Sequence, residues 1–199
     1  RLSIIDISSA GHQPMSSSTD RYIVIFNGEI YNHQEIRGLL NEVSWKGESD
    51  TETLIEAIEQ WGLSETLKKC SGMFAFSLWD RQLKRLSLVR DRMGEKPLYY
   101  GWCNDVFVFG SELKSLKAHP AFEYKIDMDA VTLYFNHGYI PAPFSIYEGV
   151  NKLTPGSILH LTLKSPHFKS PKIERYWSLN EVTSKAKIYQ TGQNKIYNH

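Results

Sequence analysis

Residues 22–28 read Tyr-Ile-Val-Ile-Phe-Asn-Gly, and this stretch decides the fold. β-Branched and aromatic side chains favour strands, and Asn-Gly is a frequent turn former. The pattern predicts a buried strand that ends in a tight turn at Asn27-Gly28. Glycine lets a ligand approach the backbone with no Cβ in the way, so we expect chemistry at this end of the strand.

Two helices are predicted after this strand. Asn32 can cap the first, which runs to about residue 43, and Asp50 can cap the second, which Gly62 stops. Apolar residues at helical spacing give each helix an inward face. The inward positions are Ile36, Leu39 and Leu40 in the first helix and Leu54, Ile55, Ile58 and Trp61 in the second.

From Gly72 onward the pattern changes to short strands, predicted at residues 73–79, 85–89, 98–102 and 106–109 with polar turns between them. Such hairpins make an antiparallel sheet. A helix is predicted at residues 129–136 and a last strand at 157–163, with residues 175–177 pairing nearby. Helices followed by hairpins favour an α+β fold over a doubly wound parallel sheet.

Composition excludes several classes of protein. The 199 residues carry 23 basic and 22 acidic side chains, a net charge of +1, so no single-sign field attracts nucleic acid or anionic lipid. No apolar run approaches the roughly 20 residues that span a bilayer. We expect neither a nucleic-acid nor a membrane partner, and a reducing cytoplasm is the simplest compartment for a chain with two cysteines and no disulfide framework.

Several segments of the chain, in order, resemble the glutaminase domain of asparagine synthetases, which are class II glutamine amidotransferases. The resemblance covers about residues 1–179. It is carried by RLSIID (1–6), FNGEIYN (26–32), GESDTE (47–52), GMFAF (72–76), RDRMGEKPLYY (90–100), SELK (111–114), GYIPAP (138–143) and LTPG (153–156).

The resemblance implies an N-terminal-nucleophile hydrolase fold, a four-layer sandwich in which two antiparallel sheets lie between helical layers and which would be incomplete in this chain. We expect a partial amidotransferase domain at residues 1–179, a connecting arm from about residue 138 and a linker at 180–199. In the family, ammonia passes from glutamine to a synthetase domain in cis that uses ATP and Mg²⁺ to amidate aspartate, and the parent can be a homodimer. No cofactor is expected in the glutaminase domain itself.

By the same resemblance, glutamine would be bound at both of its ends. Attack on its carboxamide creates an oxyanion, for which the Asn27 side chain and the Gly28 N–H are the expected donors. A cation is needed for the α-carboxylate and an anion for the α-ammonium, and Arg1 and Asp50 suit these roles, with Glu29 assisting. The expected glutamine-binding residues are Arg1, Leu2, Ser3, Ile4, Ile5, Asn27, Gly28, Glu29 and Asp50.

The nucleophile of this family is an N-terminal cysteine, and this chain has no cysteine at its start. Cys70, before a strand, and Cys103, in a predicted turn, are interpreted as structural because neither has metal-site spacing, and no metal site is expected. We therefore expect this piece alone to be inactive.

Other interpretations remain open. Asn27-Gly28 can be an ordinary turn and Asp50 only a helix cap. The domain can be a non-catalytic glutamine-binding or docking module, or can serve a different acceptor carboxylate. The charged segment 90–96 is interpreted as a turn held by salt bridges rather than a phosphate site.

Overall fold

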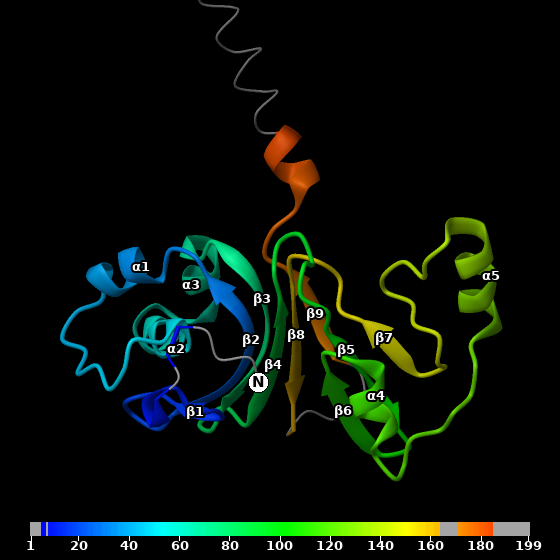
Figure 1. Ribbon diagram of the computed structural model, residues 1–199, viewed down its shortest axis with the longest axis horizontal. Coiled ribbons are helices and arrows are strands. Elements are labelled where there is room, and N and C mark those ends of the chain that lie inside the picture. The colour runs from blue at the N-terminus through cyan, green and yellow to red at the C-terminus, as the bar shows by residue number, and fades with distance from the viewer. Residues whose placement is uncertain (1–4, 7, 164–170, 185–199) are drawn as a thin grey trace, which may run out of the picture.

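The computed structural model describes residues 5–6, 8–163 and 171–184. Two antiparallel sheets lie face to face, with helices α1, α2 and α3 on the outer side of the larger sheet and α4 on the outer side of the smaller one (Figure 1). The described residues therefore form helix, sheet, sheet and helix layers. The predicted α+β class and antiparallel hairpins are confirmed.

The larger sheet has six strands in the order β1-β2-β3-β4-β8-β9, and every neighbouring pair is antiparallel. The smaller sheet has the order β6-β5-β7. The strands are β1 (Met15–Ser16), β2 (Tyr22–Ile30), β3 (Gly72–Asp80), β4 (Arg85–Arg90), β5 (Tyr99–Cys103), β6 (Val106–Gly110), β7 (Val150–Lys152), β8 (Ser157–Thr162) and β9 (Lys172–Arg175).

Strand β2 is longer than its apolar run suggests. It continues through Asn27 and Gly28 to Ile30 and pairs with β3 along its whole length, so the predicted tight turn at Asn27-Gly28 is wrong. An Asn-Gly pair does not end a strand whose partner strand continues beside it. Gly28 lies opposite Phe74 with φ +154°, a backbone conformation that side chains disfavour, and glycine adopts it without strain.

The helices follow the predicted order with different ends. They are the 3₁₀ turn η1 (Ser9–Gly11) and the α-helices α1 (His33–Leu39), α2 (Asp50–Trp61), α3 (Leu63–Lys69), α4 (Leu113–Lys117) and α5 (Met128–His137). Helix α1 ends at Leu39 rather than near residue 43, because the next residues are held to α2 by the Gln60 side chain, which bonds the backbone N–H and carbonyl of Asn41. Leu39 is 59% exposed, so its predicted inward position is wrong.

Neither predicted cap residue bonds its own helix with its side chain: Asn32 stands at the N-cap position of α1 without a side-chain cap bond, and Asp50 is the first residue of α2 rather than its cap. The Asn32 side chain donates to the Lys69 carbonyl and accepts from the Ser71 N–H, so it holds the end of β2 to the start of β3. Helix α2 is capped by Ser49, whose Oγ accepts the Glu52 N–H at 3.1 Å. A serine cap leaves the carboxylate of Asp50, the first residue of α2, available for another partner.

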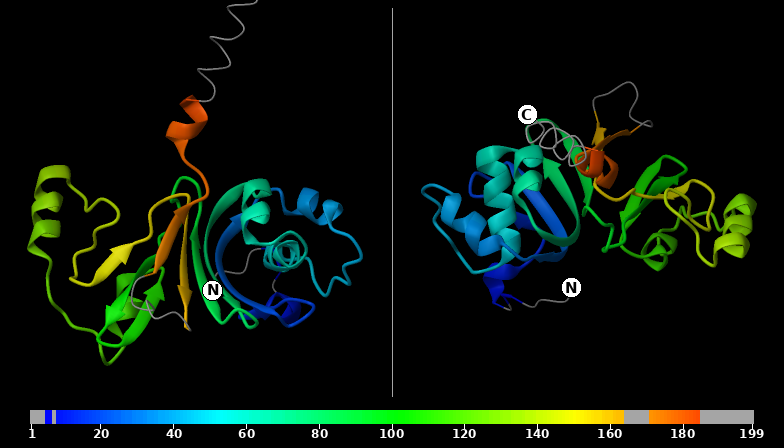
Figure 2. Two further views of the ribbon diagram at one scale, coloured as in Figure 1. Left: turned by 180° about the vertical axis from the view of Figure 1, so that it is seen from behind. Right: turned by 90° about the horizontal axis from the view of Figure 1, so that it is seen from above.

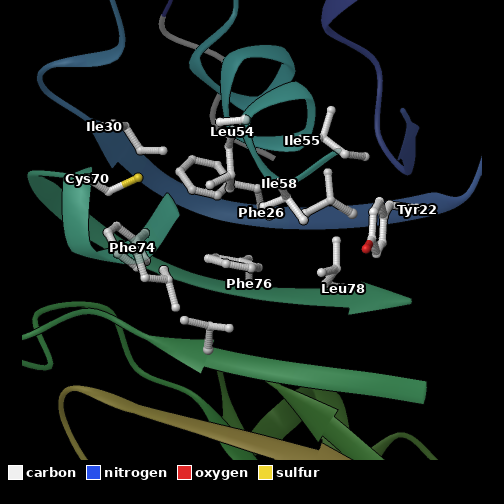
Figure 3. Close-up of a cluster of buried hydrophobic side chains, with 14 of the residues drawn as sticks. Tyr22, Phe26, Ile30, Leu54, Ile55, Ile58, Cys70, Phe74, Phe76 and Leu78 are labelled. Atoms are coloured by element: carbon white, nitrogen blue, oxygen red, sulfur yellow. The ribbon is translucent and has the colours of Figure 1, made fainter. Parts of the chain in front are cut away.

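The largest core lies between α2 and the curved face of β2 and β3 (Figure 3). Figure 3 shows Leu54, Ile55 and Ile58 pointing from the helix onto Phe26, Phe76 and Leu78 of the strands. The predicted inward face of α2 is confirmed for these three residues, and Trp61 packs at its margin. A second core fills the space between the sheets, and a third lies between the smaller sheet and α4.

The turn at residues 90–97 is not held by ion pairs between its own described side chains, as the sequence predicted. Asp91 is fully buried, and its carboxylate accepts four backbone N–H groups at 2.9–3.3 Å. These belong to Phe74, Met93, Glu95 and Lys96. The Arg90 guanidinium donates to three backbone carbonyls at 2.7–2.8 Å. Charge-assisted bonds to the backbone therefore fix the turn and the position of Lys96.

The segment after the smaller sheet departs from the compact layers. Helix α5 lies at the edge of the molecule in both figures and buries only Ala130 among its side chains (Figure 2). Gly138 ends α5, and the arm returns to the smaller sheet where the Lys152 N–H donates to the Pro143 carbonyl at 2.7 Å. Of the predicted linker, residues 180–184 are helical and residues 185–199 lie outside the described part.

Among the residues that the structure describes, no helix combines the length and the apolar character needed to cross a membrane.

Replacing Gly28 with alanine should weaken the pairing of β2 with β3. A Cβ at this position would lie 2.6 Å from the Phe74 Cα and against the Met73 carbonyl oxygen. We expect Gly28→Ala to lower the free energy of unfolding by about 3 kcal/mol, measured by urea denaturation. Gly38→Ala is the matched control, because it is helical with open space around it and should gain about 0.5 kcal/mol. Equal stability of the two variants would contradict this account.

Candidate functional site

A cavity of about 560 Å³ lies where the second half of β2 meets the start of α2. This volume is within the range of small-molecule sites in proteins. Its polar side is formed by Asn27, Gly28 and Glu29 of β2 and by Ser49 and Asp50 at the start of α2. Its apolar side chains are Ile5, Pro14, Ile25 and Met73, and Lys96 reaches it from the turn at residues 90–97.

The alternation of β2 directs its side chains to two faces. Val24 and Phe26 pack toward the helices, so Asn27 and Glu29 project to the opposite face, which looks toward the second sheet. The two polar side chains are two residues apart and therefore share one face.

Three backbone N–H groups in the second half of β2 point away from β3, to the outer edge of the strand. The Tyr31 N–H donates to Ser71 beside β3, so by alternation the N–H groups of Phe26, Gly28 and Ile30 face away from β3. The Gln13 side chain accepts from the Phe26 N–H at 2.8 Å, and Asp50 accepts from the Ile30 N–H at 3.0 Å. Gly28 stands between them, and among the described residues no side chain accepts its N–H. This donor therefore faces the cavity beside the Asn27 carboxamide.

The Asp50 carboxylate is 6% exposed and ties α2 to the end of β2 through Ile30. Burial raises the pKa of Asp50 above its ordinary value, while the hydrogen bond from Ile30 opposes that shift. Backbone hydrogen bonds from Ile30 and Thr51 compensate the burial of this carboxylate only in part, because its pKa stays raised. A bound cation would supply the missing charge.

Gln13 joins the two walls of the cavity. Its Oε1 accepts from β2, as described, and its Nε2 donates to the Thr51 Oγ1 at 3.3 Å. The spacing between the end of β2 and the start of α2 is thus set twice, by Gln13 and by Asp50. No sequence pattern marks Gln13, because both of its partners lie far from it along the chain.

The structure brings together every expected site residue that it describes. Ile5, Asn27, Gly28, Glu29 and Asp50 all line the cavity, and their roles stay predictions. Arg1, Leu2, Ser3 and Ile4 lie outside the described residues. Gln13, Ser49, Lys96 and Ser111 were missed. Ser49, Lys96 and Ser111 stand in segments that carry the family resemblance, and Ser-x-x-Glu before an apolar run is also a helix-cap pattern.

Neither cysteine lines the cavity. Cys70 lies in the core beneath α2, and burial raises its pKa to about 12. Cys103 is the last residue of β5, not a turn residue as predicted, and it is buried against α4 and its neighbours. A neutral buried thiol is a poor nucleophile, so the structural interpretation of both holds.

Outside the cavity, a serine, a histidine and a glutamate are hydrogen-bonded in the order found in hydrolytic triads. The Ser87 Oγ lies 2.8 Å from His160 Nδ1, and His160 Nε2 lies 3.4 Å from Glu174. These residues sit on β4, β8 and β9, and Ser87 is 2% exposed. A nucleophile needs access to a substrate, so we interpret these residues as a cross-strand hydrogen-bond chain.

Replacing Asp50 with asparagine should stabilise the folded chain at neutral pH. The folded-state pKa of Asp50 is raised, so the ionised carboxylate opposes folding above that pKa, and the cost disappears as pH falls toward the unfolded value of 3.8. We expect Asp50→Asn to exceed the wild type in unfolding free energy at pH 7 and to lose that advantage near pH 4, measured by urea denaturation. Asp20→Asn, at an exposed turn position, is the control. A pH-independent difference for Asp50→Asn would contradict the burial argument.

Comparison with known proteins gives a consistent result. The model of the glutamine amidotransferase domain family matches residues 1–177. The chain is 34% identical to a putative glutamine-hydrolysing asparagine synthetase 2 of Methanocaldococcus jannaschii, covering 99% of this chain and 41% of that protein. It is 40% identical to asparagine synthetase 1 of Bacillus subtilis, covering 79% of this chain and 25% of that protein. A third relative, the amidase chyE of Penicillium rubens, is 33% identical over 90% of this chain and 25% of that protein.

The chain thus spans less than half the length of these curated relatives. Among solved structures, the glutamine phosphoribosylpyrophosphate amidotransferase of B. subtilis matches with a TM-score of 0.58 at 18% identity, covering 83% of this chain and 32% of that one. That likeness places the layered sheets in the N-terminal-nucleophile hydrolase fold. The family match over residues 1–177 shows that the chain belongs to the glutamine amidotransferase domain family, and within its described relatives it is similar to part of glutamine-hydrolysing asparagine synthetases.

Proposed function

We propose that this chain binds glutamine and supplies the amide-hydrolysing site of a glutamine-dependent asparagine synthetase. One juxtaposition carries the proposal: two N–H donors at Asn27 and Gly28 share a cavity with the carboxylates of Glu29 and Asp50. Free glutamine has a carboxamide at one end and an α-ammonium at the other. A cavity with hydrogen-bond donors and buried negative charge suits both ends.

In this arrangement the α-ammonium of glutamine pairs with Asp50, with Glu29 beside it. The α-carboxylate pairs with Arg1, whose planar guanidinium can donate two parallel hydrogen bonds. The carboxamide then lies along β2 with its oxygen between the Asn27 Nδ2 and the Gly28 N–H. Negative charge that develops on this oxygen during attack is stabilised by donors already in place.

The attacking group in this proposal is a cysteine thiolate from a segment that precedes Arg1. Support comes from the chemistry of the chain, since both of its own cysteines are buried away from the cavity. An N-terminal cysteine can act as nucleophile while its α-amino group accepts the proton. On this basis residues 1–199 alone release no ammonia.

The whole protein would join this domain to a synthetase domain in cis that uses ATP and Mg²⁺ to activate aspartate, and no cofactor is needed in the glutaminase cavity. The relatives named asparagine synthetase support this arrangement. Two free cysteines are consistent with a reducing compartment, for which we propose the cytoplasm. A homodimer of the parent belongs to the same proposal.

The second candidate function is hydrolysis of glutamine to supply ammonia to an acceptor other than aspartate, and one observation favours it. A relative of comparable identity is named an amidase rather than an asparagine synthetase. Members with similar glutaminase domains can therefore serve different chemistry. Because the acceptor is chosen outside this domain, the glutamine site is compatible with either.

The proposal is tested by glutamate release from the full-length protein that carries this chain, with and without aspartate and ATP. A variant with the N-terminal cysteine replaced by alanine is the control for the nucleophile. Release that requires this cysteine and increases with aspartate supports the asparagine synthetase. Cysteine-dependent release that ignores aspartate supports another acceptor, and glutamine binding without release supports a non-catalytic glutamine-binding module.

Two variants should affect different kinetic constants. Asn27→Ala removes an oxyanion donor and is expected to lower kcat for glutaminase about 100-fold or more, with little change in KM. Asp50→Asn removes the partner of the ammonium and is expected to raise KM for glutamine about tenfold to 100-fold. Asn136→Ala, on the exposed face of α5, is the control for an asparagine truncation. If Asn27→Ala raised only KM, the oxyanion role would be wrong.

A further inference from the structure

The Asn27 side chain is held from the second sheet. Its Nδ2 donates to the Oγ of Ser111 at 3.1 Å, although the two residues are 84 positions apart in the sequence. Asn27 lies on β2 of the larger sheet, and Ser111 follows directly after β6 of the smaller one. The bond therefore crosses between the sheets at the cavity.

This contact matters because a carboxamide has two chemically opposite ends. The terminal torsion of asparagine is broad, so an exposed Asn27 without a partner would present either its oxygen or its nitrogen to the cavity. Only the nitrogen can stabilise an oxyanion. Nδ2 carries two hydrogens, so one can bond Ser111 while the other is directed into the cavity.

Ser111 itself is placed by rigid elements. The residue before it, Gly110, is paired with Tyr99 in the smaller sheet, and α4 begins two residues after Ser111 with Leu116 buried in the core. Strands and helices hold a hydroxyl more precisely than a free loop does. The orientation of Asn27 is thus set by a part of the fold that does not line the cavity.

We propose that Ser111 is a positioning residue that keeps the Nδ2 of Asn27 directed at the oxyanion during glutamine hydrolysis. The kinetic effect of Ser111 rests on the proposed function. The structural part of the inference, that the Ser111 hydroxyl immobilises the Asn27 carboxamide, is independent of the proposed function.

Steady-state glutaminase kinetics of the full-length protein test the consequence. Ser111→Ala should lower kcat about tenfold and change KM for glutamine by less than about twofold, because the Asn27 carboxamide loses its fixed orientation while its Nδ2 donor remains. Ser111→Thr keeps the hydroxyl and should recover most of the rate. Ser115→Ala, the same truncation at an exposed position of α4, should match the wild type. An unchanged kcat for Ser111→Ala in an active enzyme overturns the proposal.

A double-mutant cycle shows whether Ser111 acts through Asn27. In an Asn27→Ala background, Ser111→Ala should have no further effect on kcat. A tenfold loss that persists without the Asn27 carboxamide would mean that Ser111 acts by another route, and the positioning role would be wrong.

The side-chain amide of Asn27 gives a readout that needs no activity. In ¹⁵N-labelled protein, its NH₂ signal can be assigned by its loss in Asn27→Ala. The heteronuclear NOE of this signal should be high, as for a rigid group, in the wild type and in Ser115→Ala, and low, as for a mobile group, in Ser111→Ala. An equally rigid signal in Ser111→Ala overturns the proposal even if the enzyme is active. An inactive wild type with the expected change in rigidity would instead refute the proposed function and leave the Ser111 contact established.

Discussion

The pairing of β2 with β3 from Tyr22 to Ile30 is the constraint on which the rest of the molecule depends. It presents one face of β2 to α2 and so defines the main core. It also turns the backbone N–H groups of Phe26, Gly28 and Ile30 to the opposite edge, where side chains or a ligand must satisfy them. One ladder of hydrogen bonds thus determines both where the protein is packed and where it is able to bind.

The elements with strong local patterns could be predicted from the sequence. The apolar spacing of α2 and the hairpins of the middle strands needed no information from distant residues. Two expectations failed because a distant partner overrode a local preference: Asn-Gly stays in a strand because β3 continues beside it, and the Asn32 side chain binds the segment before β3 instead of its own helix. A third failed locally, because the Asp91 carboxylate binds backbone N–H groups of its own turn and of Phe74 instead of neighbouring cations.

The residues of the candidate site also fall into those that could be predicted from the sequence and those that could not. Asn27, Gly28, Glu29 and Asp50 were found because they stand in recognisable short motifs, although the structural reason given for Asp50 was wrong. The roles of Gln13 and Ser111 could not be found, since each acts through side-chain contacts with residues far along the chain. No sequence pattern of a lone glutamine or serine specifies such a contact. The groups that hold a site are less visible in the sequence than the groups that form it.

The two glycines where β2 and β3 meet have a consequence for redesign. Side chains at Gly28 and Gly72 would collide with the backbone of the opposite strand, so neither position accepts a larger residue. The Gly28 N–H on the polar side of the cavity is therefore a main-chain donor that no substitution can replace by another group. A protein engineer who wished to change the ligand would have to alter the side chains around it, at lining positions such as Met73 and Lys96. The ligand preference can be changed at these positions while the backbone donor stays fixed.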